Sequence, residues 1–90
     1  MRILLADDHT LVRAGIRALV ESFPDCQVVG EAASAKEAVD MARAHNPDVV
    51  LMDITMKESS GLQAAGQIRQ ELPQIRVIIL SMHATEDFVS

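Results

Sequence analysis

The sequence predicts a doubly wound α/β domain, in which a parallel sheet carries helices on both faces. Short, uninterrupted apolar stretches alternate with longer segments whose apolar residues repeat at helical spacing. Such alternation implies right-handed crossovers between parallel strands. The chain has 90 residues, which is room for a single domain (1–90) with one small core.

The first three elements are predicted as strand, helix and strand. The stretch 3–6 is typical of a strand that is covered on both faces. We expect Thr10 to be the N-cap of a helix that Pro24 stops. Its apolar residues repeat at helical spacing and are Val12, Ile16, Leu19, Val20 and Phe23. The segment 27–30 predicts a second strand, which ends in a tight turn at Gly30.

The second helix is predicted from its start and stop signals. Ser34 and Glu37 have the spacing of a capping box, in which each side chain satisfies a free backbone N–H at the start of the helix. We expect the helix to run to residue 45 or 46, because Pro47 follows.

The second half of the chain repeats the alternation. The stretch 49–52 is the third strand, and a third helix has its apolar face between residues 61 and 72 and ends at Pro73. The stretch 77–80 predicts a fourth strand that is buried on both faces. Thr85 is the expected N-cap of a fourth helix, which the chain barely begins.

Composition and charge exclude several classes of protein. At 49% hydrophobic and 23% charged residues, the chain is in the ordinary globular range. Phe23 and Phe88 are the only aromatic residues and the net charge is -5, which disfavours direct binding of nucleic acid. Cys26 stands alone, so no internal disulfide forms and a cytoplasmic location fits best. Two aspartates interrupt the apolar start, which excludes a signal peptide or membrane span there.

Polar residues of a distinctive kind follow three of the four predicted strands. Asp7 and Asp8 follow the first strand, Asp53 the third and Ser81 the fourth. In an open parallel sheet these strand ends meet at the edge where ligands bind. Three carboxylates in a small cleft repel one another unless a cation lies among them, and oxygen ligands of this kind suit Mg²⁺. We therefore expect Asp7, Asp8 and Asp53 to bind Mg²⁺.

Four segments resemble the receiver domains of two-component response regulators. They are LLADDHTLVRAGIRALV, VVGEAASAKEAV, PDVVLMDITM and RVIILSMHA, and they are most similar to the NarL/FixJ/LuxR-type subgroup, which carries a helix-turn-helix output. The resemblance covers the whole chain, and its motifs are specific as a set. It implies a CheY-like, flavodoxin-like sheet in which the strand order is 2-1-3-4-5.

The resemblance also implies roles for individual residues. Asp53 would accept a phosphoryl group from a histidine kinase, in a signalling domain that is not itself an enzyme. Asp8 and Asp53 would ligate Mg²⁺ with the backbone carbonyl of Thr55, and Asp7 would hold a water of the metal. Ser81 would contact a phosphoryl oxygen as the switch that controls a DNA-binding output domain.

The chain departs from the family pattern in two ways. First, Lys57 stands where the family has a proline in the loop after Asp53. Second, the chain lacks the family's fifth strand, whose lysine pairs with the phosphoryl group, and the family's last helix. We therefore expect an incomplete receiver with four strands and about three helices. Without that lysine the formal charge around the phosphoryl group is about -2 instead of about -1, which predicts weaker phosphorylation. Lys57 is a candidate to supply part of the lost charge.

The histidines do not have the spacing of a metal site. His9, His45 and His83 are far apart in the sequence, and we expect each to be exposed to solvent, although His9 and His83 lie near strand ends. The methionines at 41, 52, 56 and 82 are interpreted as gap-filling core or loop residues.

The sequence argues against two other functions and leaves one alternative open. An aspartyl-phosphate phosphatase needs a second aspartate two residues after the nucleophile, where this chain has Thr55. A dinucleotide-binding fold needs glycines in the first strand-to-helix turn, and this chain has no glycine there. The serious alternative is a degenerate receiver that binds protein partners without phosphorylation, because the lysine is missing and Lys57 is unusual.

The fourth strand also predicts self-association. Residues 77–80 contain no charge, proline or glycine, and without a fifth strand their backbone groups form an open template. The missing last helix would uncover apolar side chains on one face of the sheet. We expect a homodimer or higher oligomer through this edge or face.

Overall fold

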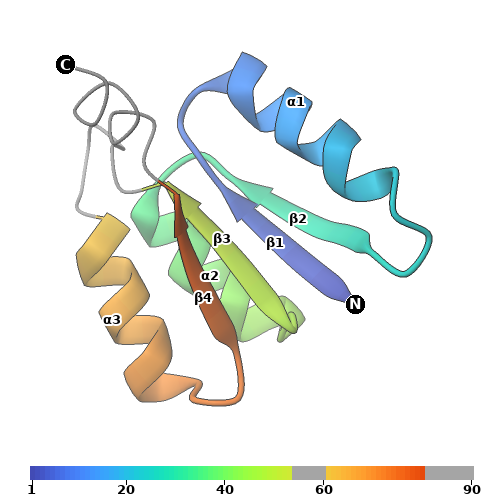
Figure 1. Ribbon diagram of the computed structural model, residues 1–90. Helices are drawn as coiled ribbons and strands as arrows, with labels where there is room; N and C mark the ends of the chain where they lie inside the picture. Colours follow the sequence, from blue (N-terminus) through green and yellow to red (C-terminus); the bar gives the residue numbers. More distant parts are fainter. Residues whose placement is uncertain (54–60, 81–90) are drawn as a thin grey trace, which may run out of the picture.

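The computed structural model describes residues 1–53 and 61–80, which form one sheet flanked by helices (Figure 1). The strands are β1 (Arg2–Ala6), β2 (Gln27–Ala32), β3 (Val49–Asp53) and β4 (Arg76–Leu80). The helices are α1 (Thr10–Glu21), α2 (Ala35–His45) and α3 (Gly61–Glu71). Strands and helices alternate along the chain, as the sequence predicts.

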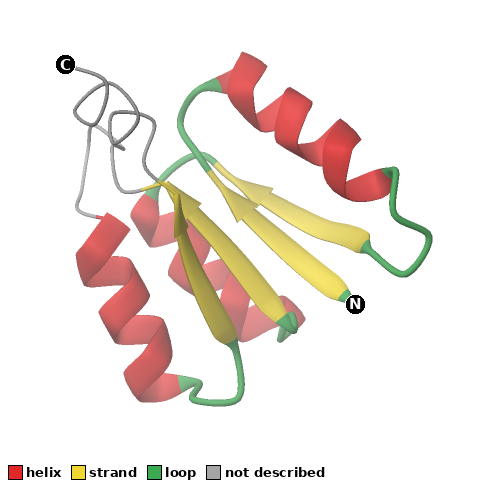
Figure 2. Cartoon of the chain, viewed as in Figure 1, coloured by secondary structure: helices red, strands yellow, loops and turns green. Residues whose placement is uncertain are grey.

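The sheet has the strand order β2-β1-β3-β4, and every pair of neighbouring strands is parallel. All four arrowheads in Figure 2 therefore point toward the same end of the sheet. Helix α1 lies on one face and α2 and α3 lie on the other (Figure 1). The predicted doubly wound α/β fold, with four strands and three helices in the described residues, is confirmed.

The capping box predicted for α2 is confirmed. The Ser34 hydroxyl accepts a hydrogen bond from the Glu37 backbone N–H at 3.2 Å. The Glu37 carboxylate in turn accepts one from the backbone N–H of Ala33 at 2.9 Å. The helix ends at His45, and Asn46 follows in the left-handed conformation with φ 47°. Helix α2 thus begins and ends where its local signals indicate.

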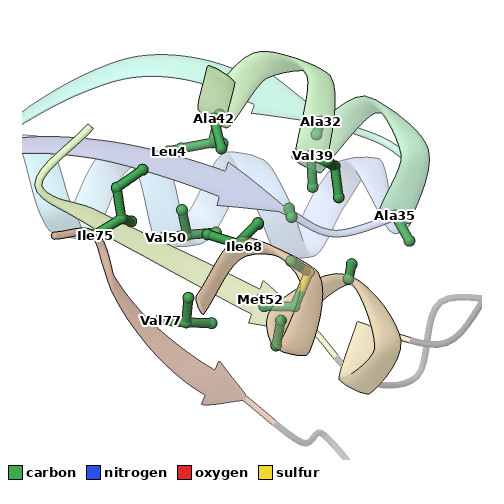
Figure 3. Packing of buried hydrophobic residues seen from close by; sticks show 14 residues of the cluster. Leu4, Ala32, Ala35, Val39, Ala42, Val50, Met52, Ile68, Ile75 and Val77 are labelled. Carbon is green, nitrogen blue, oxygen red and sulfur yellow. The ribbon is translucent and has the colours of Figure 1, made fainter. Parts of the chain in front are cut away.

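The larger part of the core lies between the sheet and the helices α2 and α3 (Figure 3). Alternate residues of β1 and β3, including Leu4, Val50 and Met52, are fully buried there. Helix α2 contributes mainly alanines, which let it pack close to the sheet, and α3 contributes Ile68, which is also fully buried. The side of the sheet that carries α2 and α3 therefore holds the larger cluster of buried residues.

The core on the α1 side is smaller and covers only part of the sheet. It is built from Ile3, Leu5, Val20, Val28 and Val49, and α1 packs against β1 and β2. Fewer apolar residues of α1 contact the sheet than its sequence predicts. Its Leu19 is 64% exposed, and Phe23, just past its end, is 55% exposed.

Strand β4 is not buried on both faces, so that prediction was wrong. Val77 is buried on the α3 side, whereas Ile78 is 47% exposed. Ile78 pairs in register with Leu51, and both point to the face that carries α1. Because α1 lies over β1 and β2, no described helix reaches this part of the sheet.

Gly30 does not end β2 in a turn, which corrects a second prediction. The strand continues to Ala32, and an extra residue interrupts its pairing with β1 between Val28 and Gly30. A methyl group at Gly30 would lie 3.2 Å from the Leu4 Cδ1 atom. Because its backbone φ is not positive, Gly30 reflects close packing against Leu4 inside the sheet and not a turn.

Thr10 is the first residue of α1 and not its N-cap. The N-cap is His9, which has an extended backbone and makes no capping bond through its side chain. The backbone N–H of His9 instead donates a hydrogen bond of 2.8 Å to Asp7 Oδ1. The turn between β1 and α1 is therefore held by an aspartate that precedes the helix.

Candidate functional site

The strand ends of β1 and β3 bring together four side chains from separate parts of the sequence. These strands are neighbours in the sheet, with Ala6 paired to Met52. Asp7 and Asp8 therefore emerge beside Asp53, the last residue of β3. One side-chain ligand atom from each of Asp7, Asp8, His9 and Asp53 can be chosen so that all four lie within 4.8 Å of one another. The predicted meeting of the three carboxylates is thus found, and a histidine joins them.

The carboxylates are shielded from solvent to different degrees. Asp53 is 1% exposed and Asp7 is 3% exposed, and they are the only buried charged residues within 1–53 and 61–80. The Asp8 side chain is 18% exposed. Burial of several carboxylates is costly unless opposite charge or hydrogen bonds compensate it. This edge of the sheet therefore combines concentrated negative charge with poor access to water.

The His9 ring lies against all three carboxylates of the cluster. Its Nδ1 atom lies 3.0 Å from Asp8 Oδ1, 3.2 Å from Asp7 Oδ1 and 3.8 Å from Asp53 Oδ2. The His9 side chain is 48% exposed, so it forms the outer boundary of the cluster. The expectation that His9 is exposed to solvent is confirmed, and its ring also faces the carboxylates.

An arginine from α1 fixes the backbone at Asp7. Arg13 donates from Nη1 to the Asp7 carbonyl at 2.6 Å and from Nε to Glu31 Oε1 at 3.0 Å. The Asp7 N–H also donates to the Ala32 carbonyl at 2.9 Å, which extends the pairing of β1 with β2. Both backbone groups of Asp7 are thus satisfied by neighbouring elements. Such support holds a functional side chain in a fixed position.

Glu31 links this support to the rest of α1. Burial raises the pKa of Glu31, but the hydrogen bonds and charges of Arg17 and Arg13 together outweigh it and hold the pKa below its usual value. The same contact to Glu31, with a smaller one to Glu21, raises the pKa of Arg17. The two arginines therefore connect α1 to β2 through the Glu31 carboxylate, which stays ionised.

Several predicted site residues lie outside the described part of the chain. Thr55, Lys57 and Ser81 fall in the ranges 54–60 and 81–90, as do His83 and the start of the fourth helix at Thr85. Their expected roles stay predictions. Sequence reasoning placed His9 near a strand end but did not assign it to the carboxylate cluster. Its position directly after Asp8, where β1 ends, was the signal that could have found it.

The chain belongs to the family of response regulator receiver domains, which it matches over residues 3–90. It is 43% identical over 90 residues to the transcriptional regulatory protein MctR of Rhizobium johnstonii, covering 100% of this chain and 42% of that protein. It is also 43% identical over 81 residues to the response regulator protein VraR of Staphylococcus aureus, covering 90% of this chain and 39% of that protein. The chain thus spans less than half of the length of these relatives.

Solved structures agree with this assignment. A two-component response regulator of the LuxR family from Aurantimonas superposes with a TM-score of 0.87 at 43% identity, covering 98% of this chain and 63% of that one. The signal receiver domain of the putative response regulator NarL from Mycobacterium tuberculosis gives a TM-score of 0.85 at 35% identity, covering 91% and 66%. The resemblance to NarL- and LuxR-type receivers is therefore confirmed.

No helix within residues 1–53 and 61–80 combines the length and apolarity needed to cross a membrane. The longest of them has 12 residues, whereas a bilayer requires about 20.

Proposed function

We propose that this receiver domain accepts a phosphoryl group on Asp53 from a histidine kinase and that Mg²⁺ assists the transfer. The observation that carries the proposal is the position of Asp53, which ends β3 beside Asp7 and Asp8 in one cluster. A carboxylate is a poor nucleophile toward a dianionic phosphoryl group unless the local charge is offset. A carboxylate among other carboxylates fits this role only with a bound cation.

The donor atoms of the cluster fit Mg²⁺. Magnesium prefers oxygen ligands at about 2.0–2.1 Å and keeps several waters, so a few carboxylates suffice. Asp8 Oδ1 and Asp53 Oδ2 each expose less than 1 Å² to solvent, which makes them well shielded oxygen donors. By the family resemblance Asp8 and Asp53 are direct ligands, the Thr55 carbonyl is a third, and Asp7 holds a metal-bound water. Bound Mg²⁺ would supply positive charge opposite the incoming phosphoryl group.

The residues of the chain would then act in the following order. An oxygen of Asp53 attacks the phosphorus atom, the P–N bond to the donor histidine breaks, and the electron pair leaves with the imidazole. Asp7, held by Arg13 and by the His9 N–H, stays in place during this step. Ser81 would donate a hydrogen bond to a phosphoryl oxygen that exists only in the modified state, which shifts the protein between two conformations.

We further propose that the modified domain controls a DNA-binding output in the cytoplasm. MctR is described as a transcriptional regulatory protein, and RcsB from Salmonella, whose structure was determined with promoter DNA, superposes with a TM-score of 0.83 at 28% identity. The free thiol of Cys26 is compatible with a reducing compartment. The net charge of -5 favours a regulatory role over direct contact with DNA for this segment.

Mass spectrometry after incubation with acetyl phosphate and Mg²⁺ tests the acceptor role. We expect the parent to gain one phosphoryl group and Asp53→Asn to gain none. Asp40→Asn is the matched control, because it removes an aspartate of α2 whose side chain is 59% exposed and which is not part of the cluster. If the parent gains no phosphoryl group, the domain is instead the phosphorylation-independent interaction module that the unusual Lys57 suggests.

We also propose that the chain self-associates through the open side of β4. Among the described strands none pairs with the outer edge of β4, and Ile78 is 47% exposed on the face that α1 leaves uncovered. Unpaired strand edges and apolar patches favour association with a second copy.

Sedimentation velocity over a range of concentrations tests the association. The parent should form dimers or larger species, and Ile78→Glu should be monomeric. Leu62→Glu places the same charge on an apolar residue of α3 that is 60% exposed, and it should associate like the parent. A parent that stays monomeric at every concentration contradicts the proposal.

A further inference from the structure

We propose that His9 is an additional ligand of the metal site, so that the site prefers divalent transition ions such as Co²⁺ over Mg²⁺. The inference rests on the proposed function, because it takes the metal position among Asp7, Asp8 and Asp53 as given. It goes further in assigning His9 to the bound ion and in naming the class of ion that an imidazole selects.

The distances around His9 fit the coordination sphere of one ion. With metal–ligand bonds of about 2.1 Å, adjacent ligands of an octahedral ion lie about 3.0 Å apart and opposite ligands about 4.2 Å apart. The His9 Nδ1 atom is 3.0 Å from Asp8 Oδ1, which matches adjacent ligands. Its distance of 3.8 Å from Asp53 Oδ2 lies between the two ideal values. One ligand atom from each residue of the cluster lies within 4.8 Å of the others, so one ion could contact them after shifts of less than about 1 Å.

The backbone presents the imidazole to the site. The His9 N–H is bound to Asp7 Oδ1, and the His9 carbonyl accepts a hydrogen bond of 2.9 Å from the Arg13 N–H in the first turn of α1. Both backbone groups of His9 are thus fixed, so its side chain starts from a defined point at the edge of the cluster. Only the side-chain torsions of His9 then have to be fixed when its ring binds an ion.

The chemistry of an imidazole ligand determines which ions bind more tightly. Carboxylate and carbonyl oxygens suit Mg²⁺, whereas imidazole nitrogen suits transition ions. For a mixed nitrogen and oxygen site the affinity rises from Mn²⁺ through Co²⁺ to Ni²⁺. A nitrogen from His9 therefore adds little to the binding of Mg²⁺ and much to the binding of Co²⁺. When Nδ1 binds an ion, the ring proton must be on Nε2, at the exposed side of the ring.

The test measures metal binding directly and does not depend on phosphorylation. Titration calorimetry gives the affinities for Co²⁺ and Mg²⁺, and electron spin echo modulation of bound Mn²⁺ detects a directly coordinated nitrogen. The variants are His9→Ala and His9→Gln, the latter keeping polar atoms without an imidazole. The control is His45→Ala, which removes an exposed histidine at the far end of α2.

We expect the nitrogen coupling of Mn²⁺ in the parent and in His45→Ala, and its loss in both His9 variants. The ratio of Co²⁺ to Mg²⁺ affinity should also fall in both His9 variants. We expect a fall of ~10–100-fold or more, because the loss of a residue that only supports a metal ligand already lowers metal affinity by that factor. A parent that binds Mn²⁺ without nitrogen coupling, or coupling that survives His9→Gln, overturns the role of His9 and leaves the proposed Mg²⁺ site intact. The metal site itself, and the inference with it, is overturned if the parent binds none of these ions. The same holds if an Asp53→Ala variant binds them with the same affinity as the parent.

Discussion

Replacing Asp53 with asparagine should stabilise the metal-free protein while abolishing its function. Asp53 is 1% exposed, and its ligand oxygen lies within 4.8 Å of those of Asp7 and Asp8. Two unit charges at that distance repel by about 3.5 kcal/mol at an effective dielectric constant of about 20. The variant removes this repulsion but keeps a side chain of nearly the same shape.

The expected gain is smaller than the repulsion itself. A buried amide costs about 1–3 kcal/mol in mutational data, so counting one carboxylate pair leaves a net gain of about 0.5–2.5 kcal/mol. We count only one carboxylate pair, that of Asp53 with one neighbouring aspartate. A domain of this size has a total stability of roughly 5–13 kcal/mol, so the gain should be readily measurable.

Urea denaturation in EDTA and in Mg²⁺ separates the two effects. In EDTA the midpoint should be higher for Asp53→Asn than for the parent. A saturating ligand stabilises the native state by about 2.7 kcal/mol at 100 times its dissociation constant, so Mg²⁺ should raise the parent's midpoint and hardly move that of the variant. Asp40→Asn, which removes one exposed charge, should behave like the parent in both buffers. An Asp53→Asn variant that is less stable than the parent in EDTA would refute the charge argument.

Three further predictions concern the scaffold of the site. Ile68→Ala should lower the free energy of unfolding by about 2–5 kcal/mol, because Ile68 is fully buried between α3 and the sheet; a loss below about 1 kcal/mol in urea denaturation would contradict this packing. Ser34→Ala should cost about 1 kcal/mol through the lost cap of α2, and combined with Glu37→Ala it should cost less than the sum of the two single changes if the capping box acts as a unit. Because the pKa of Glu31 is below its unfolded value of 4.5, its stabilising contribution is complete above that value and is lost as the pH falls through the folded pKa. Arg17→Ala should therefore reduce the fall in urea midpoint between about pH 6 and about pH 3. An unchanged fall would show that the Arg17–Glu31 ion pair does not stabilise the fold.

The order and type of the elements could be predicted from the sequence because their signals are local. The doubly buried strands β1 and β3 are short apolar runs, and the α2 helix begins at a capping box whose partners are three residues apart. The meeting of Asp7, Asp8 and Asp53 also follows from topology, since parallel neighbouring strands end at one edge of the sheet. These features need only the chain direction and the periodicity of side chains.

Other features depend on contacts between residues that are distant in the sequence. Gly30 looks like a turn residue, but β2 continues through it and the Leu4 side chain from β1 packs close to its backbone. Ile78 looks like a buried strand residue, yet α1 lies over β1 and β2 and does not reach it. Local sequence cannot reveal which neighbour covers a side chain, so both assignments required the packed structure.

His9 shows the same limit at the site itself. The sequence by itself determined that His9 follows two aspartates at the end of a strand, and its spacing from the other histidines argued against a shared metal site. The tertiary structure decided that its ring faces Asp7, Asp8 and, 3.8 Å away, Asp53 on the neighbouring strand. Its partners are carboxylates, and one of them is 44 positions further along the chain. Only the pairing of β1 with β3 places that carboxylate within reach, because the sheet converts a long separation in sequence into a short distance in space.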